Sequence, residues 1–200
     1  MLRAAAGIAV IFLAACATVP PPIPETTVPP ADWAARTAAL AAVQDWTLNG
    51  RVALHNGHDA WSAGLHWTQR RDAYRVSLYG PLGQGVVQMD GDGSGGVLRL
   101  ADDKTFKSSN MEDLLYRELG WHIPVDGLRF WARGLPVPDA PTHYAFDAQG
   151  RLVWLEQFGW HVAYLRYTRV DRLALPQRVD ITRRKLSVKL VVDQWDVTPR

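Results

Sequence analysis

Apolar and polar residues alternate along most of this chain. The clearest run covers residues 61–68, where every second side chain is large or apolar: Trp61, Ala63, Leu65 and Trp67. A period of two places alternate side chains on opposite faces, so the pattern predicts a β-strand with one buried face. The same pattern covers residues 48–54 and 74–78, and Asn56-Gly57 between the first two runs is typical of a hairpin turn.

Eight more strands and three short helices are predicted in the rest of the chain. The further strands fall at 86–90, 97–101, 105–107, 142–146, 152–158, 160–170 and, with a turn near 183–185, 178–197. A helix over 33–46 is capped by Asp32. A second opens with the capping box Ser109-Asn110-Met111-Glu112 and ends at Gly120, and a third covers 126–133 and is closed by Gly134.

The order of these elements predicts a mainly β, antiparallel domain of about eleven strands. Most strands follow one another through short turns, which favours antiparallel pairing. Several are long and carry large apolar side chains on one face only. Such a sheet has to curl around a helix, around itself or around a ligand, and the pattern leaves these three possibilities open.

The first residues are predicted to be a targeting segment that is not part of the fold. Arg3, an apolar stretch and Ala14-Ala15 form a signal peptide over 1–15, too short to span a bilayer. Leu13-Ala14-Ala15-Cys16 matches a bacterial lipobox, and Cys16, the only cysteine, would carry the lipid anchor. The alternative is an ordinary secretory signal with a stray cysteine.

A proline-rich segment over 16–32 links this anchor to a domain over 33–200. The composition of residues 17–31 predicts an extended tether of about 45 Å at ~3.1 Å per residue. Ala17 follows Cys16. In Gram-negative lipoproteins an aspartate at this position usually keeps the protein at the inner membrane, so the resemblance to lipoproteins points to the outer membrane.

Composition excludes several classes of function. Hydrophobic residues make up 48% of the chain and charged residues 21%, which is typical of a globular protein. A net charge of +2 is too small for a dedicated nucleic-acid binder. The basic residues of the C-terminal part could face anionic head groups, an acidic partner or only solvent: Arg166, Arg169, Arg172, Arg178, Arg183, Arg184, Lys185 and Lys189.

Catalytic motifs are scarce, so a binding role is favoured over an enzyme. Gly91-Asp92-Gly93-Ser94-Gly95-Gly96 has the letters of a dinucleotide loop, but a strand follows where that motif needs a helix, so a hairpin turn is predicted. No phosphate loop, nucleophile elbow or supported metal spacing is present in the sequence. We therefore expect no cofactor and no metal.

Nine tryptophans are the unusual feature of the composition. Any one of them is more often a core residue than a ligand contact. Together, the aromatic and aliphatic residues of the strands and the third helix form a candidate wall for apolar chains. We expect a ligand cavity lined by Trp61, Leu65, Trp67, Trp131, Trp154, Trp160 and Tyr164. Trp33 and Trp46 need only close the first helix, which packs against this cavity.

One loop has a distinctive composition. Pro81, Leu82 and Gly83 lie between two predicted strands, and Leu82 is the only large apolar residue of the loop. On a lipid-anchored protein, this loop is a candidate for membrane contact.

Several short motifs, in order, carry a family resemblance. They include Leu48-Asn49-Gly50-Arg51-Val52-Ala53, Trp67-Thr68-Gln69, Gly80-Pro81-Leu82-Gly83, Leu128-Arg129-Phe130-Trp131-Ala132-Arg133-Gly134-Leu135-Pro136, and Gly159-Trp160-His161-Val162-Ala163-Tyr164. With the lipobox and Leu175-Pro176, they make the chain similar to the outer-membrane lipoprotein receptor family LolB.

This resemblance implies an unclosed antiparallel β-barrel of eleven strands, with helices lidding a hydrophobic cavity. It implies a monomeric receptor, lipid-anchored in the outer membrane and facing the periplasm. The expected partners are a soluble periplasmic carrier of the LolA type, the acyl chains of lipoprotein cargo and outer-membrane lipid. It assigns membrane insertion to Leu82 and cavity positions to Trp67, Trp131 and Trp160.

Two other functions remain possible at this point. The main one is a structural or assembly lipoprotein that binds protein or cell-wall partners through its surface. A lipid or glycan hydrolase is a more distant one. An open apolar cavity with tryptophan in its wall would distinguish the receptor from the first of these.

Overall fold

A computed structural model describes residues 25–80 and 85–197. The signal peptide, Cys16 and the loop residues Pro81, Leu82 and Gly83 lie outside the described residues. The described helices are α1 (Trp33–Ala42), α2 (Met111–Leu119) and α3 (Val125–Trp131). The described strands are β1 (Asp45–His55), β2 (Ala60–Arg70), β3 (Ala73–Tyr79), β4 (Gly85–Asp92), β5 (Gly95–Leu100), β6 (Thr105–Ser108), β7 (His143–Phe146), β8 (Leu152–Gln157), β9 (Trp160–Val170), β10 (Leu173–Arg183) and β11 (Leu186–Val197).

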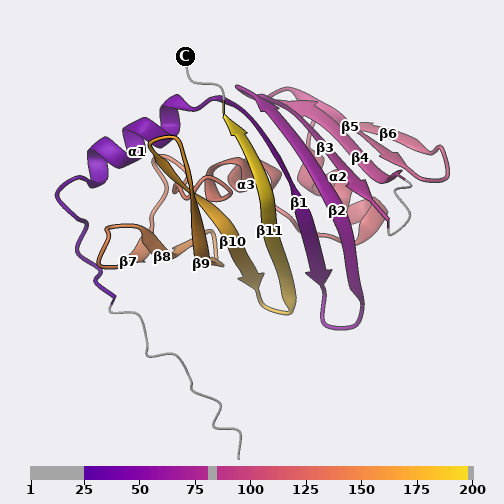
Figure 1. Cartoon of the computed structure of the whole chain (residues 1–200). Helices are drawn as coiled ribbons and strands as arrows, with labels where there is room; N and C mark the ends of the chain where they lie inside the picture. The colour runs from indigo at the N-terminus through magenta and orange to yellow at the C-terminus, as the bar shows by residue number, and fades with distance from the viewer. Residues whose placement is uncertain (1–24, 81–84, 198–200) are drawn as a thin grey trace, which may run out of the picture.

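All eleven described strands form one antiparallel sheet in the order β6-β5-β4-β3-β2-β1-β11-β10-β9-β8-β7. Two meanders, β1 to β6 and β7 to β11, are joined where β1 pairs with β11. β6 and β7 are the two edges and do not pair with each other, so the barrel is unclosed (Figure 1). This confirms the predicted fold class.

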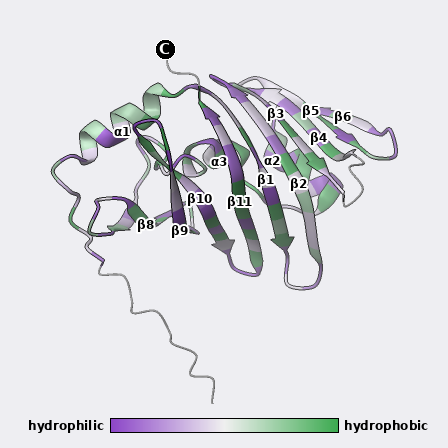
Figure 2. Cartoon of the chain, in the orientation of Figure 1, coloured by the Kyte–Doolittle hydropathy of each residue, from purple (hydrophilic) through white to green (hydrophobic). Residues whose placement is uncertain are grey.

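The concave face of the sheet carries the core. Strands alternate between hydrophobic and hydrophilic residues along their length (Figure 2), and the inward set is buried. Leu48, Val162 and Val179 are among the core side chains with no exposed surface. A long sheet with one apolar face lowers its free energy by curling until that face is covered.

A bulge at Asp193 of β11, opposite Asn49 and Gly50 of β1, helps the sheet to curl. The pairing of β1 with β11 shifts register between Asn49 and Gly50. A Cβ at Gly50 would lie only 2.2 Å from the carbonyl oxygen of Val191, so no larger residue fits there. Glycine at this point lets the two backbones approach and the strand bend.

The first helix is shorter than predicted. α1 ends at Ala42, and Trp46 lies in β1 instead of in the helix. Trp46 is buried, with its ring centroid 4.9 Å from that of Trp67 and 5.4 Å from that of Trp195. The expectation that Trp46 closes a helix was wrong, because the inward alternation of the sheet begins before the run recognised in the sequence.

Two other boundaries also differ. The N-cap of α2 is Asn110, whose side-chain oxygen accepts a hydrogen bond from the Asp113 N–H, instead of Ser109. Asp32 precedes α1 but forms no side-chain capping bond. β10 begins at Leu173, five residues before the predicted strand, because a tight turn at 171–172 lets it pair at once with β9.

Other predictions from turns hold. Gly120 ends α2 in the left-handed conformation with φ of 71°. The glycine-rich stretch is a hairpin, since β4 ends at Asp92 and β5 begins at Gly95. In the described part of the chain, no helix is long and apolar enough to cross a membrane.

Arg133 fastens α3 to the end of α1. Its guanidinium donates hydrogen bonds to the carbonyls of Leu40 (3.2 Å) and Val43 (2.5 Å), and its Nε donates to the Arg129 carbonyl (3.0 Å). Burial lowers the pKa of Arg133 to about 10, so the group remains charged at neutral pH. A cation at a helix C-terminus also interacts favourably with the helix dipole.

We predict that Arg133→Leu destabilises the domain by about 3 kcal/mol, because it leaves the buried carbonyl oxygen of Val43 without its donor and removes one of two donors to that of Leu40. Arg133→Lys should recover part of this loss. Urea denaturation measures the effect, and the exposed Arg166 provides a control whose replacement by leucine should change stability by less than about 0.5 kcal/mol. Equal effects of the two leucine variants would contradict the assigned role.

Candidate functional site

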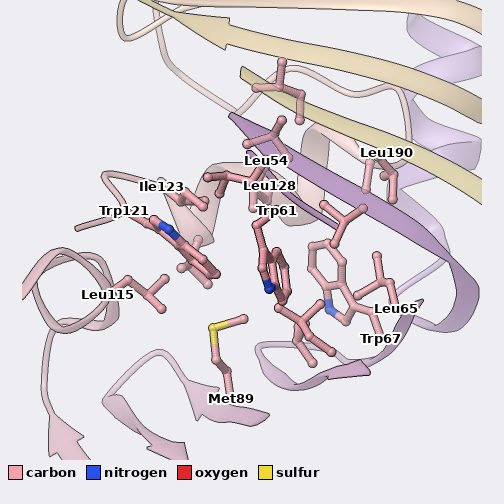
Figure 3. Close-up of a pocket in the computed structure, with 17 residues that line it drawn as sticks. Leu54, Trp61, Leu65, Trp67, Met89, Leu115, Trp121, Ile123, Leu128 and Leu190 are labelled. Atoms are coloured by element: carbon pink, nitrogen blue, oxygen red, sulfur yellow. The ribbon is translucent and has the colours of Figure 1, made fainter. Parts of the chain in front are cut away.

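An apolar cavity lies between the concave face of the sheet and the helices α2 and α3 (Figure 3). Its free volume is about 100 Å³. All of the lining side chains are hydrocarbon, thioether or indole: Val52, Leu54, Trp61, Leu65, Trp67, Val76, Leu78, Met89, Leu115, Trp121, Ile123, Val125, Leu128, Ala132, Ile181, Val188 and Leu190. None of these side chains can titrate, so the cavity can hold hydrocarbon but offers no acid or base.

The strands supply one wall and the helices the other. Inward positions of β1, β2 and β3 face the cavity because the period of two puts alternate residues on one side. The opposite wall comes from Leu115 of α2, from Trp121 and Ile123 in the connection, and from α3. The cavity therefore lies where the α2–α3 segment covers the sheet.

Two tryptophans meet across these walls. The rings of Trp61, on β2, and Trp121, on the α2–α3 connection, have centroids 5.4 Å apart and are tilted by 45°. In Figure 3, Trp61 stands between Trp121 on one side and Trp67 on the other. Both Trp61 and Trp121 are only partly buried, which places their contact at the rim of the cavity.

Trp67 presents carbon to the cavity because its polar edge is already bonded. Its Nε1 donates to Oε1 of Gln69 at 3.1 Å, and Gln69 donates in turn to the carbonyl of Arg71 at 2.7 Å. Both side chains are buried. A buried indole N–H needs an acceptor, and Gln69 supplies it away from the cavity.

Trp131, Trp160 and Tyr164 were also predicted to line a cavity, but they are not among the residues that line this one. They form a buried cluster in which the rings of Trp131 and Trp160 are 6.3 Å apart. The hydroxyl of Tyr164 donates to the Trp131 carbonyl at 3.1 Å. Burial raises the pKa of Tyr164 well above its usual range, so the hydroxyl stays protonated as a donor.

Gln157 explains why Trp131 belongs to the framework. Its Oε1 accepts from Trp131 Nε1 (3.0 Å) and from the Val137 N–H (2.8 Å). Its Nε2 donates to the Val137 carbonyl (3.0 Å) and to Thr142 Oγ1 (2.7 Å). This buried amide is fully satisfied and ties the chain after α3 to β8.

Trp154 is also outside the cavity. Its Nε1 donates to the carboxylate of Glu25 at 3.0 Å. The next residue, Thr26, exchanges two backbone hydrogen bonds with Phe146 of β7, at 3.0 and 2.8 Å. The segment before α1 is therefore docked along the β7 edge of the sheet.

Of the seven predicted cavity residues, Trp61, Leu65 and Trp67 come together in the wall. The sequence reasoning missed Trp121, Ile123, Val125 and Leu128. The interrupted apolar run between Gly120 and Gly127 could have indicated them, but no periodicity marks it. Among the described residues, no group of three or more His, Cys, Asp or Glu could hold a metal ion.

Comparison of the sequence with known proteins assigns the chain to a family. The sequence profile of the family described as outer membrane lipoprotein LolB matches residues 44–195. The chain belongs to the LolB family. The Nitrosococcus oceani outer-membrane lipoprotein LolB is 38% identical over 188 residues, covering 94% of this chain and 93% of that protein. The Pseudomonas putida one is 39% identical over 166 residues, covering 83% and 81%.

Solved structures agree on the fold. A LolA superfamily protein from Nitrosomonas europaea superposes with a TM-score of 0.53 at 8% identity, covering 82% of this chain and 93% of the other. A DUF1329 family protein from Desulfovibrio piger gives 0.53 at 7% identity, covering 83% and 90%. As a LolB, the chain is an outer-membrane lipoprotein facing the periplasm, a receptor in lipoprotein localisation and not an enzyme.

We predict that Trp61→Ser weakens the binding of an alkyl-chain fluorophore about tenfold, because it removes apolar contact area at the rim.

Trp131→Phe should leave fluorophore binding unchanged but lower stability by about 1–3 kcal/mol, because Gln157 loses a bonded donor. Fluorescence titration and urea denaturation measure the two effects. If the Trp131 variant lost more fluorophore affinity than the Trp61 variant, the ligand would bind at the Trp131–Trp160 cluster instead of in this cavity.

Proposed function

We propose that the cavity lined by Trp61, Leu65 and Trp67 receives the acyl chains of a lipoprotein from a soluble periplasmic carrier of the LolA type. The observation that carries the proposal is a cavity wall made of apolar side chains under a helical cover. One copy of the chain contains a complete wall, so it acts as a monomer. Cys16 anchors the receptor.

The chemistry of the cargo requires a closed route. Three acyl chains contain on the order of 45 methylenes, and exposing them at ~0.8 kcal/mol each would cost tens of kcal/mol. The chains must therefore pass from one apolar cavity to the next. With no nucleotide loop in the sequence, direction follows from rising affinity along the route, from carrier to receptor to bilayer.

The cover has to move for this to happen. A volume of about 100 Å³ is well below the roughly 300–1,000 Å³ of ordinary ligand sites. The end of α3 is fixed by Arg133 and, through Trp131, by Gln157. Opening is therefore expected at α2 and Trp121, where the contact with Trp61 separates and the cavity becomes continuous with its surroundings.

Leu82 is proposed as the residue that touches the bilayer during insertion. The loop joins the end of β3, at Tyr79, to the start of β4, at Gly85. The support is the resemblance of Pro81-Leu82-Gly83 to the family pattern and the apolar character of leucine beside glycines. Membership in LolB disfavours the alternative of an assembly lipoprotein that works only through its surface.

The direct test is transfer of a fluorescently labelled, triacylated lipoprotein from purified carrier to this receptor in solution. The receptor should acquire the label without ATP. A receptor with Leu65→Asn, which places an amide in the cavity wall, should acquire much less. Failure of the unaltered receptor to acquire any label would contradict the proposal.

We predict that Leu82→Glu leaves acceptance from the carrier intact but strands the cargo on the receptor, because a carboxylate does not enter the bilayer. Leu82→Met is the matched control and should insert normally. Vesicle flotation separates inserted from stranded cargo. Normal insertion by the glutamate variant would exclude Leu82 from the insertion step.

A further inference from the structure

An exposed aromatic ring stands in an unfavourable turn. Phe158 and Gly159 form the two-residue connection between β8 and β9, with φ of 54° and 74°. A turn with two positive φ values favours Asn-Gly, and phenylalanine is unusual at its first position. The ring is nevertheless 55% exposed. Neither burial nor turn geometry accounts for phenylalanine at this site.

Three cations lie beside this turn. Arg183, Arg184 and Lys185 form the end of β10 and its connection to β11, and all three are exposed. A Cβ at Gly159 would be 3.8 Å from Nε of Arg183, whose guanidinium lies over the Trp160 ring at 5.7 Å. In the described chain, none of the three forms an ion pair with a carboxylate.

The neighbouring turn carries one carboxylate. Lys185 packs against the β1–β2 turn, where its side chain would be 3.1 Å from a Cβ at Gly57. The carboxylate in that turn, Asp59, is within hydrogen-bond reach of the Asn56 side-chain amide at 3.4 Å. With Glu156 on the β8–β9 hairpin, two carboxylates oppose the three cations, so these described turns combine an exposed ring with a net charge of one positive unit.

Topology places these turns at one end of the sheet. Because the strands are antiparallel, the β1–β2, β8–β9 and β10–β11 connections share an end, at which β3 also ends and β4 begins. Figure 1 shows the β1–β2 and β10–β11 hairpins side by side. A flat surface approaching this end would meet Phe158 and the cations together.

We propose that Phe158, Arg183, Arg184 and Lys185 form a second membrane-contacting surface, which seats this end of the domain on anionic lipid. An aromatic ring is stable at the level of the head groups, and cations close to an anionic surface are attracted to it. The lipid anchor of the family keeps such a membrane within reach. The proposal depends on this outer-membrane location, not on the cavity or on Leu82.

Site-directed labelling tests the contact in the full lipidated chain on vesicles. Cys16 is the only cysteine and the proposed acylation site, so Phe158→Cys offers a single free thiol for an environment-sensitive fluorophore. Leu165→Cys is the control, because Leu165 is similarly exposed at 52% but lies along β9, away from the turns. The label at position 158 should brighten on phosphatidylglycerol-containing vesicles, and the label at 165 should not.

Charge removal should abolish most of this response. Each cation near an anionic surface strengthens membrane partitioning roughly fivefold. The affinity of this surface for anionic lipid should therefore fall on the order of a hundredfold in the combined variant Arg183→Ser, Arg184→Ser and Lys185→Ser. The fluorescence increase at position 158 should also be lost on pure phosphatidylcholine vesicles or at high salt. Equal responses at 158 and 165, or a response that requires the carrier instead of anionic lipid, would overturn the proposal.

A second variant separates this contact from folding. Phe158→Asn suits the turn better and should raise the melting temperature, while hydrogen exchange at the β8–β9 and β10–β11 turns should no longer slow on anionic vesicles. Undiminished protection in this variant would contradict a role for the ring. Cargo transfer in solution should remain normal, which distinguishes failure here from failure of the receptor function.

Discussion

Covering one apolar face of a long sheet is the constraint on which this structure depends. Eleven described strands alternate inward and outward, and their inward side chains cannot face water. A closed barrel would hide them, but β6 and β7 do not pair, so the α2–α3 segment has to cover part of the face. Because this cover is helical and adds no strand to the sheet, its α2 end can be displaced without breaking strand pairing, while α3 stays bonded to Gln157. An apolar cavity beneath a separable cover is what a carrier of acyl chains needs.

The acceptors of three indole N–H groups help to fix which way these tryptophans face. Trp131 and Trp195 donate to Gln157 and to the Pro176 carbonyl, and both rings are buried in the scaffold. Trp67 donates sideways to Gln69, which leaves its carbon face toward the cavity. Trp61 lies at the rim, with Trp121 opposite. At Trp67 the wall is therefore apolar because Gln69 accepts the indole N–H away from the cavity.

The alternation in the sequence was sufficient to predict the strands, their antiparallel order and the three helices, because each depends on local periodicity. The cavity wall was predicted only on β2, where Trp61, Leu65 and Trp67 share a face. Trp131, Trp160 and Tyr164 have the same residue types, but they pack against one another and are not among the residues that line the cavity. This packing depends on the position of α3, fixed by the long-range bonds of Arg133 and Gln157, which no local pattern contains. Trp154 was misplaced because its partner, Glu25, lies in a segment without periodicity.

The pairing of Thr26 with Phe146 limits how far the domain can move from its membrane anchor. With Cys16 as the proposed anchor, nine Cα-to-Cα steps separate it from the docked Glu25, and a chain of that length spans at most about 32 Å. A link that ran free to Trp33 could span about 60 Å. The accessible volume grows with the cube of the reach, so docking confines the domain to about one seventh of that volume. Its effective concentration at the membrane surface rises by the same factor. A single β-bridge at the edge of the sheet thus keeps the domain close to the membrane surface.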